Sequence, residues 1–420
     1  AKGEEGELAE DELKKAAEDL PIVRIVDTLL RHAMAQRVSD IHIEPSEKEV
    51  VVRYRIDGIL HDAMVLPRQV AVGIVARVKV LSSLKLDEHR LPQDGRFKIE
   101  TEHEKFSFRV SILPVYAGEK VVMRLLPENA KGFTLEVLGF YGEGLERIHR
   151  AVRRPVGMIL VTGPTGSGKT TTLYTILDLL NTPTVNISTI EDPIEYRIPR
   201  VNQTQVKPDI GFTFANGLRS LVRQDPDIIM VGEIRDNETA SLAINAALTG
   251  HLVLSTLHTN SAAGALPRLL DMKVEPFLIA STVNVIGAQR LVRRLSKAKE
   301  PYKLSKEELH ELGKEMDLNR VLGFLKEEKV IKEKEDWSDI TFYKPKASSE
   351  SEDGYQDRIG VHEVLEVTES IKRLIMSNAT SDEIEKQGKT EGMMTMLEDG
   401  IVKAAKGITT IEEVLRVTRE

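Results

Sequence analysis

The chain has 420 residues, of which 41% are hydrophobic and 30% are charged, and its formal net charge is −8. This length predicts two to four domains with ample core, and the composition is ordinary for a globular protein. The acidic balance argues against nucleic acid and anionic membrane surfaces as partners, and the absence of cysteine excludes disulfides and thiolate metal sites.

The chain opens on an acidic segment. Residues 1–20 are rich in Glu and Asp and predict a frayed helix or a linker, without the pattern of a signal peptide. The first residue is Ala1 rather than Met, which leaves an earlier start of the natural chain open. No apolar run approaches the roughly 18 residues that a membrane-spanning helix needs. We therefore expect contact with a membrane only through partners.

Residues 21–126 predict a compact α/β domain. Apolar residues recur at helical spacing from Pro21 to Met34, and a second helix is expected from Pro67 to about Leu86. Asp57-Gly58 forms a hairpin turn between two alternating segments. The expected strands are 41–43, 49–56, 59–60, 97–99, 106–113 and 120–126.

Residues 140–295 predict a parallel sheet wrapped by helices, after a linker at 127–139 that contains turn-forming residues. Short apolar segments alternate with helical ones, which is typical of parallel α/β domains. Ligands of such sheets bind at the carboxyl ends of the strands. The strands are expected at Met158–Val161, Val185–Ile190, Ile228–Val231 and Leu252–Leu257, with helices at 141–154 and 171–180.

The last part of the chain differs in composition. Lys and Glu dominate residues 296–354, which predict an exposed, inserted helical module. Regular structure resumes at Tyr355, and residues 355–420 predict a C-terminal helical part. Late helices are marked by two capping boxes, Thr380 with Glu383 and Thr410 with Glu413.

The stretch Gly163–Thr170 fits G-x-x-x-x-G-K-[ST], the phosphate loop of nucleoside triphosphatases. It follows an apolar strand and opens a helix, so backbone N–H groups and the helix dipole converge on one anion site. Lys169 is expected to reach the β- and γ-phosphates, and the Thr170 hydroxyl to contact Mg²⁺. ATP and Mg²⁺ are the expected cofactors, and the residues expected to bind them are Gly163, Pro164, Thr165, Gly166, Ser167, Gly168, Lys169, Thr170 and Thr171.

Carboxylates follow two of the expected strands. Glu233 comes where phosphate-loop enzymes place an acid that holds Mg²⁺ or its water. Glu191, Asp192 and Glu195 cluster after another strand, and Glu191 is nearest the strand end. The functional interpretation is a general base or water-positioning group, with Glu191 first, and the alternative is a solvated acidic turn. The phosphate loop favours the functional interpretation.

His258 and three arginines are further candidates. His258 lies at the carboxyl end of its strand, where it could contact the γ-phosphate, and the alternative is a structural histidine. Arg96, Arg109 and Arg124 lie in or beside strands of the first domain. In one interpretation these arginines face solvent or pair with acids. In the other they supply positive charge to a triphosphate, across a cleft or from a neighbouring subunit, and the sequence alone leaves both interpretations open.

Four sequence boxes occur in order: Gly163–Thr172, Thr189–Arg197, Leu221–Asp236 and Thr249–Asn260. Three segments of the first domain accompany them: Ser39–Pro45, Tyr54–Gly58 and Pro92–Arg96. In this order they resemble the ATPases of type IV pilus assembly and type II secretion. The resemblance covers roughly residues 21–296 and 355–420.

The resemblance implies a RecA-type phosphate-loop ATPase core, preceded by a smaller α/β, PAS-like domain and followed by a helical C-terminal tail. It also implies a cytoplasmic hexamer, peripheral at the inner membrane. Such a hexamer would dock on an inner-membrane platform protein and hydrolyse ATP to add pilin subunits or to power secretion.

The resemblance also implies roles for single residues. Glu191 would be the hydrolytic glutamate, Glu233 the Walker B acid and His258 the sensor of the histidine box. Arg109 and Arg124 would reach the nucleotide from the first domain. The implied metal contacts are Thr170 and Glu233, which would hold Mg²⁺.

Two departures from the family stand out. Assembly ATPases usually carry two C-x-x-C pairs that bind zinc, which here would fall near Ser296 and before Gly354, and no zinc is expected because the cysteines are absent. The family's first N-terminal docking domain does not occur in this sequence, so we expect either a fragment or a short member of the family. The alternatives kept are a pilus retraction ATPase, a non-hydrolysing nucleotide switch and a RecA-type DNA-binding protein, the last disfavoured by the absence of a basic–aromatic stripe.

Overall fold

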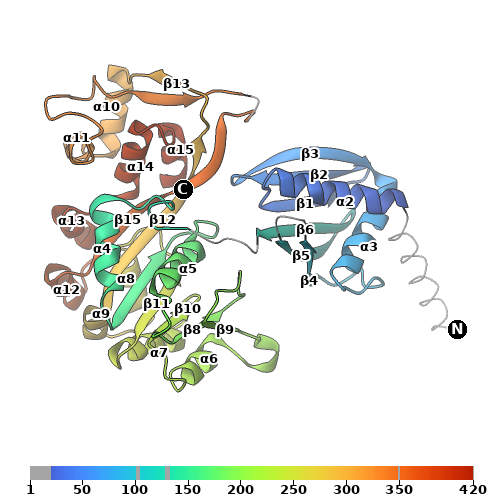
Figure 1. Ribbon diagram of the computed structural model, residues 1–420, viewed down its shortest axis with the longest axis horizontal. Coiled ribbons are helices and arrows are strands. Elements are labelled where there is room, and N and C mark those ends of the chain that lie inside the picture. The colour runs from blue at the N-terminus through green and yellow to red at the C-terminus, as the bar shows by residue number, and fades with distance from the viewer. Residues whose placement is uncertain (1–19, 101–104, 128–132, 349–350, 420) are drawn as a thin grey trace. The chain divides into compact units, whose positions relative to one another are not determined.

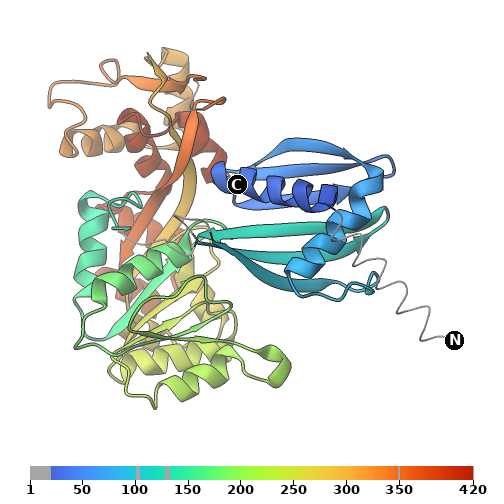
Figure 2. The same cartoon turned by 45° about the vertical axis from the view of Figure 1, so that its right-hand side comes forward.

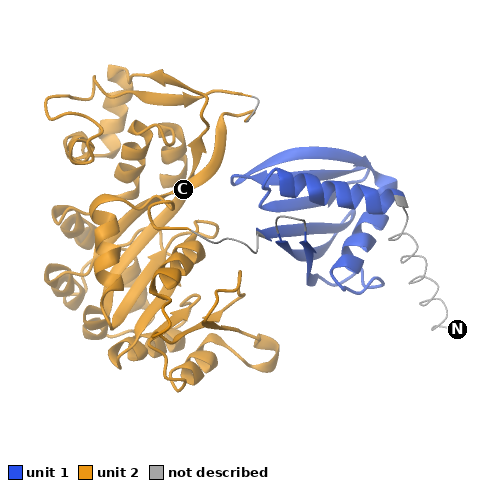
Figure 3. Cartoon of the chain, viewed as in Figure 1, with its two compact units in different colours: residues 1–131 blue, residues 132–420 orange. Residues whose placement is uncertain are grey.

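The computed structural model describes residues 20–100, 105–127, 133–348 and 351–419. It divides into two compact units, residues 1–131 and residues 132–420 (Figure 3). The predicted acidic helix or linker at 1–20 lies outside the described residues, apart from residue 20. The finer division of the chain stays a prediction.

The first unit is an antiparallel sheet with two helices packed on one face. Its strand order is β3-β2-β1-β6-β5-β4. The elements are α2 (Leu20–Ala35), β1 (Asp40–Pro45), β2 (Glu49–Ile56), β3 (Ile59–Pro67), α3 (Ala71–Leu81), β4 (Gln93–Glu100), β5 (Lys105–Val115) and β6 (Gly118–Pro127). Alternate strand residues such as Ile41, Ile43 and Phe108 form one core with the apolar stripe of α2 and with α3. The predicted strands and the first helix are confirmed.

The predicted helix from Pro67 to about Leu86 is too long at both ends. A 3₁₀ turn at Arg68–Val70 precedes α3, which stops at Leu81. Ser83 adopts a left-handed backbone with φ of 56°. The N–H of Leu84 donates to the carbonyl of Lys79 at 2.9 Å, which closes the helix in the manner of a Schellman motif. The apolar residues after Leu81 therefore keep helical spacing in the sequence, although the helix has already ended.

The second unit is built on a seven-stranded sheet with the order β15-β12-β7-β11-β10-β8-β9. All neighbours are parallel except β12 and β15. The strands are β7 (Gly157–Thr162), β8 (Ile187–Glu191), β9 (Val201–Gln205), β10 (Ile228–Val231), β11 (Leu252–Leu257), β12 (Val283–Leu295) and β15 (Tyr355–Glu366). The four apolar segments predicted as strands are confirmed, and their carboxyl ends share one edge of the sheet.

Helices cover both faces of this sheet (Figure 1). One core joins alternate strand residues to α4 (Gly142–Val152) and α5 (Lys169–Leu180). The other joins the opposite strand residues to helices on the second face. Those helices are α6 (Phe214–Leu221), α7 (Asn237–Leu248), α8 (Ala265–Asp271), α9 (Pro276–Thr282), α12 (Glu369–Met376) and α13 (Ser381–Thr390). Burial on both faces explains why the strands read as continuous apolar runs rather than alternating ones.

The inserted module contains more than the predicted helices. Helices α10 (Lys306–Glu315) and α11 (Leu318–Glu327) are accompanied by a two-stranded ribbon, β13 (Lys299–Tyr302) and β14 (Phe342–Pro345). The module shares an apolar core with α14 (Met396–Ala405) and with Ile411 at the start of α15 (Ile411–Thr418). These elements lie at the same end of the unit in both views (Figures 1 and 2). The module is therefore packed on the C-terminal helices rather than simply exposed.

The C-terminal part begins with the strand β15 and continues as helices. The predicted capping box at Thr380 is complete. At α15 the box is only half formed, because Thr410 accepts from the N–H of Glu413 but the Glu413 carboxylate binds Arg293 and Arg416 instead.

Candidate functional site

The phosphate loop connects the end of β7 to the first turn of α5. Gly163, Gly166 and Gly168 have φ of 145°, 80° and 87°, a region that favours glycine. At Gly163 a Cβ atom would lie 2.4 Å from the carbonyl oxygen of Gln289, so no side chain fits there. The sequence thus folds into the turn that the pattern predicts.

Lys169 is folded back on this loop. Its Nζ donates to the carbonyl oxygens of Gly163 at 2.7 Å and Pro164 at 3.0 Å. Burial lowers the pKa of Lys169, and the nearby carboxylate of Glu233 opposes that shift. The ammonium group is thus held inside the curve of the loop, close to the acid that follows β10.

The loop fits a phosphate group. The Ser167 hydroxyl is buried and has no hydrogen-bond partner among the described residues. Lys169, the first residue of α5, follows the left-handed Gly168, and no side chain caps this helix N-terminus. An uncapped helix N-terminus, an unpartnered hydroxyl and a buried ammonium together form a site for an anion.

Gln289 on β12 is a residue of this site that the sequence did not predict. Its side-chain nitrogen donates to the carbonyl oxygen of Ser167 at 2.6 Å, and its side-chain oxygen accepts from the Thr172 hydroxyl at 2.8 Å. The side chain is buried, with 2% exposed. Gln289 therefore clamps the phosphate loop to the first turn of α5.

Glu233 and His258 meet at the carboxyl edge of the sheet. Nε2 of His258 lies 3.4 Å from a carboxylate oxygen of Glu233, whose other oxygen lies 2.5 Å from Arg235. Gly232, just before Glu233, packs on the backbone at the end of β8, where a Cβ would lie 3.3 Å from the Glu191 Cα. Glu191 and Glu233 are predicted as candidates from two separate strands. The structure shows that these strands, β8 and β10, are neighbours in the sheet.

Glu191 is the last residue of β8 and is buried, with 2% exposed. Its carboxylate accepts hydrogen bonds from the Tyr174 hydroxyl, from the Thr189 hydroxyl at 2.5 Å and from the Gln203 amide at 3.2 Å. Burial raises the pKa of Glu191, and these hydrogen bonds partly offset the rise. Glu195, four residues later in the same acidic turn, is only half-buried.

The loop that carries His258 is tied to the sheet at two points. The Thr162 hydroxyl, directly before the phosphate loop, accepts from the N–H of Thr259 at 2.8 Å. The buried carboxylate of Glu363 on β15 accepts from the N–H of Ala262 at 2.8 Å. Burial raises the pKa of Glu363 to about 7. The C-terminal strand thus reaches the site through this loop.

Arg109 and Arg124 belong to the first unit, whereas the phosphate loop belongs to the second. They face each other directly on β5 and β6, and Arg96 faces Arg109 from β4. Arg124 donates to Asp40 at 2.9 Å. The structure therefore brings the arginines together with one another.

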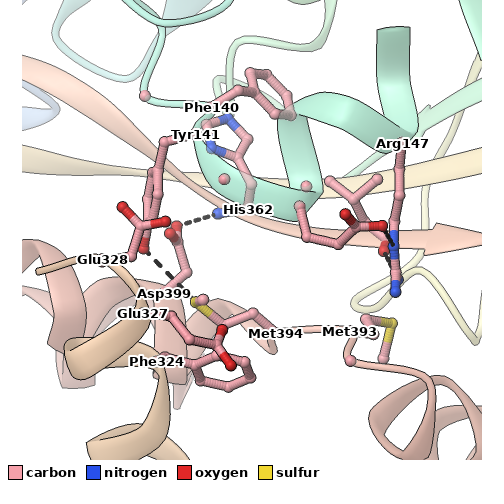
Figure 4. Close-up of a pocket in the computed structure, with 16 residues that line it drawn as sticks. Phe140, Tyr141, Arg147, Phe324, Glu327, Glu328, His362, Met393, Met394 and Asp399 are labelled. Carbon is pink, nitrogen blue, oxygen red and sulfur yellow. Dashed lines mark hydrogen bonds and ion pairs between the residues drawn. The ribbon is translucent and has the colours of Figure 1, made fainter. Parts of the chain in front are cut away.

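A cavity of about 330 Å³ lies elsewhere in the second unit, and no residue of the phosphate loop lines it (Figure 4). Tyr141, Phe140, Phe324 and Met394 give it aromatic and apolar walls. Several of the charged groups around it are paired within the protein. The pairs are Glu328 with Lys406, Asp399 with Lys403, and Arg147 with the carbonyl oxygens of Val364 and Glu391.

Comparison with known proteins places these motifs in a family. The profile described as "Type II/IV secretion system protein" matches residues 15–416. The chain is 47% identical over 409 residues to "Type II secretion system protein E" of Xanthomonas campestris pv. campestris, covering 97% of this chain and 69% of that protein. It is 44% identical over 409 residues to "Type IV pilus assembly ATPase PilB" of Myxococcus xanthus, covering 96% and 69%.

Solved structures agree in fold. The pilus retraction motor PilT with bound ADP superposes with a TM-score of 0.62 at 25% identity, covering 93% of this chain and 96% of that chain. Among the described residues, no helix is both long and apolar enough to cross a membrane. The chain belongs to the type II/IV secretion system protein family, whose members include ATPases of type II secretion and of type IV pilus assembly.

Proposed function

We propose that this chain is the ATP-hydrolysing subunit of a motor that powers pilus assembly or type II secretion. The observation that carries the proposal is the grouping of Lys169, Glu233 and His258 beside a phosphate loop at one edge of a parallel sheet. The strand order β12-β7-β11-β10-β8 supports a RecA-type core, and the six-stranded sheet with two helices supports a PAS-like first domain. The names of the relatives supply the biological process.

Different residues of the site would serve nucleotide binding and hydrolysis. The phosphate loop would bind the triphosphate through its N–H groups, and Lys169 would exchange its carbonyl partners for phosphate oxygens. Thr170 and Glu233 would hold Mg²⁺, which neutralises charge on the β- and γ-phosphates. His258, whose Nε2 lies 3.4 Å from a carboxylate oxygen of Glu233, would sense the terminal phosphate.

The acidic turn after β8 would position the attacking water. Glu191 is the first candidate from its place at the strand end. Its carboxylate, however, already accepts three hydrogen bonds and has little exposed surface. A general base must come within hydrogen-bond reach of the water, which favours the more accessible Glu195 as the rival.

Two isosteric variants separate these candidates. If Glu191 positions the water, Glu191→Gln keeps ATP binding and loses hydrolysis by about 10²- to 10⁴-fold, the usual contribution of a general base. Glu195→Gln then hydrolyses at a near wild-type rate. The reverse pattern would assign the role to Glu195 and leave Glu191 as an anchor of the turn. Single-turnover hydrolysis with nucleotide affinity measured in parallel distinguishes the two.

The assembly is proposed to be a cytoplasmic hexamer, peripheral at the inner membrane and docked on a platform protein. The relatives named as parts of secretion and pilus systems support this proposal. A retraction motor is the second candidate, supported by the likeness to PilT. Pili observed in cells that lack the chain distinguish the two candidates. Loss of extension would indicate an assembly motor, and loss of retraction would indicate a retraction motor.

A further inference from the structure

The Tyr174 hydroxyl lies at the centre of a buried polar cluster beside the acidic turn that follows β8. It donates a hydrogen bond to the Glu191 carboxylate. It accepts hydrogen bonds from the N–H of Glu195 at 3.3 Å and from the side-chain amide of Gln203 at 3.4 Å. A hydroxyl has one donor and two acceptor positions, so all three are used. One group is thus bonded to the side chain of one acid that is a candidate for positioning the water and to the backbone of the other.

The phosphate loop and the acidic turn follow strands that are not neighbours. In the sheet, β7 and β8 are separated by β11 and β10. The chain passes from one strand to the other through α5, which begins at Lys169 and carries Tyr174 in its second turn. The Tyr174 hydroxyl therefore bonds the helix of the phosphate loop to a turn at which the sheet itself does not place that loop.

The other two described groups that bond to the Glu191 carboxylate do not provide this connection. Thr189 lies on β8, two residues before Glu191, and Gln203 lies on the adjacent strand β9. Both belong to the same edge of the sheet as the acidic turn. Of these three groups, only the Tyr174 hydroxyl comes from α5.

The cluster is well suited to hold an acid in one orientation. Tyr174 and Glu191 are 1% and 2% exposed, so water competes little for their hydrogen bond. Burial raises the pKa of the Tyr174 hydroxyl well above its usual range, and the Glu191 carboxylate raises this pKa further, so the phenol remains a donor. The Tyr196 ring packs edge-on against the Tyr174 ring, with 4.6 Å between the ring centroids.

We propose that Tyr174 is a positioning residue for hydrolysis, whose hydroxyl holds the acidic turn in a fixed place relative to the phosphate loop. The proposal rests on the proposed function, in which an acid of this turn orients the attacking water. Tyr174 acts only through that acid and touches neither the water nor the nucleotide.

Single-turnover ATP hydrolysis by the full chain, with the Kd for ATP measured separately, tests this role. Tyr174→Phe removes the hydroxyl and keeps the ring in the core. Tyr196→Phe is the matched control, because its ring packs against that of Tyr174 while its hydroxyl has no hydrogen bond to any described residue. A thermal melt of each variant sets an assay temperature at which all of them are folded.

We expect Tyr174→Phe to lower the rate of hydrolysis by about ten- to a hundredfold, the cost of a misplaced group, while the Kd for ATP stays near the wild-type value. Tyr196→Phe should match the wild type in both measurements. Of Glu191→Gln and Glu195→Gln, the variant that loses hydrolysis should lose no more when Tyr174→Phe is added, because the hydroxyl then has no acid left to position.

Three results would overturn the proposal. The first is a Tyr174→Phe rate equal to that of the control, with or without a lower melting temperature, which would make the hydroxyl purely structural. The second is a faster Tyr174→Phe rate, which would mean that the hydroxyl restrains the acid. The third is a double variant in which the two losses multiply. A wild-type chain without turnover would instead remove the proposed function.

Discussion

Replacing Gln289 by Met tests whether β12 holds the phosphate loop in its binding conformation. Methionine is similar in length to glutamine but offers neither strong donor nor strong acceptor. The change removes the bond to the Ser167 carbonyl at 2.6 Å and the bond from the Thr172 hydroxyl at 2.8 Å. A buried hydrogen bond contributes about 1 kcal/mol, and a partner left unsatisfied costs more, so the two together amount to about 2–3 kcal/mol.

This loss should appear mainly in nucleotide binding, because the loop is free to relax when it is no longer clamped. Since 1.4 kcal/mol corresponds to a factor of ten, we expect Kd for a fluorescent ATP analogue with Mg²⁺ to rise by at least about tenfold. Gln387→Met is the matched control, because Gln387 is also hydrogen-bonded, to Glu391 at 2.7 Å, but lies on α13. If Gln289→Met lowers the melting temperature and leaves Kd at the wild-type value, the clamp is structural only and the reasoning is wrong.

Three further predictions concern binding and stability. Lys169→Ala should abolish detectable binding of the same analogue, since the only ammonium group in the loop is lost, and binding near wild-type affinity would contradict its role. Burial raises the pKa of Glu363 to about 7, so stability is lost as pH rises through that value. Between pH 5 and pH 8, the free energy of unfolding of Glu363→Gln should therefore rise relative to that of the wild type by on the order of 3 kcal/mol, as measured by chemical denaturation. A difference between the two proteins that does not change with pH would refute this. Burial opposes ionisation of Glu413, but hydrogen bonds from Arg416 and Arg293 lower its pKa to about 2. Glu413→Gln should cost about 3 kcal/mol at pH 7, and the cost should shrink as pH falls below about 4, whereas a pH-independent cost would exclude the ion pairs as its cause.

The strands and the phosphate loop could be predicted because their signals are local. Apolar runs bounded by turn residues locate β7, β10 and β11, and the glycine pattern fixes the turn before α5. The end of α3 could not be predicted from its apolar residues, because a left-handed backbone at Ser83 stops the helix while apolar residues continue.

Contacts between distant parts of the chain could not be predicted in this way. Gln289 lies more than a hundred residues after Ser167, and nothing in its own surroundings marks it as a partner of the phosphate loop. The burial of Glu191 depends on Tyr174 and Gln203, which reach it from α5 and β9. The register that aligns Arg96, Arg109 and Arg124 depends on how three strands pair, although each arginine was a candidate by itself.

The most direct test of the account is ATP turnover measured against protein concentration, with particle mass determined at the same points. If the chain is a motor subunit whose active site is completed by arginines of a neighbour, turnover appears only as hexamers form. Monomers that hydrolyse ATP at the full rate would contradict the shared site, and hexamers that hydrolyse none would contradict the motor itself.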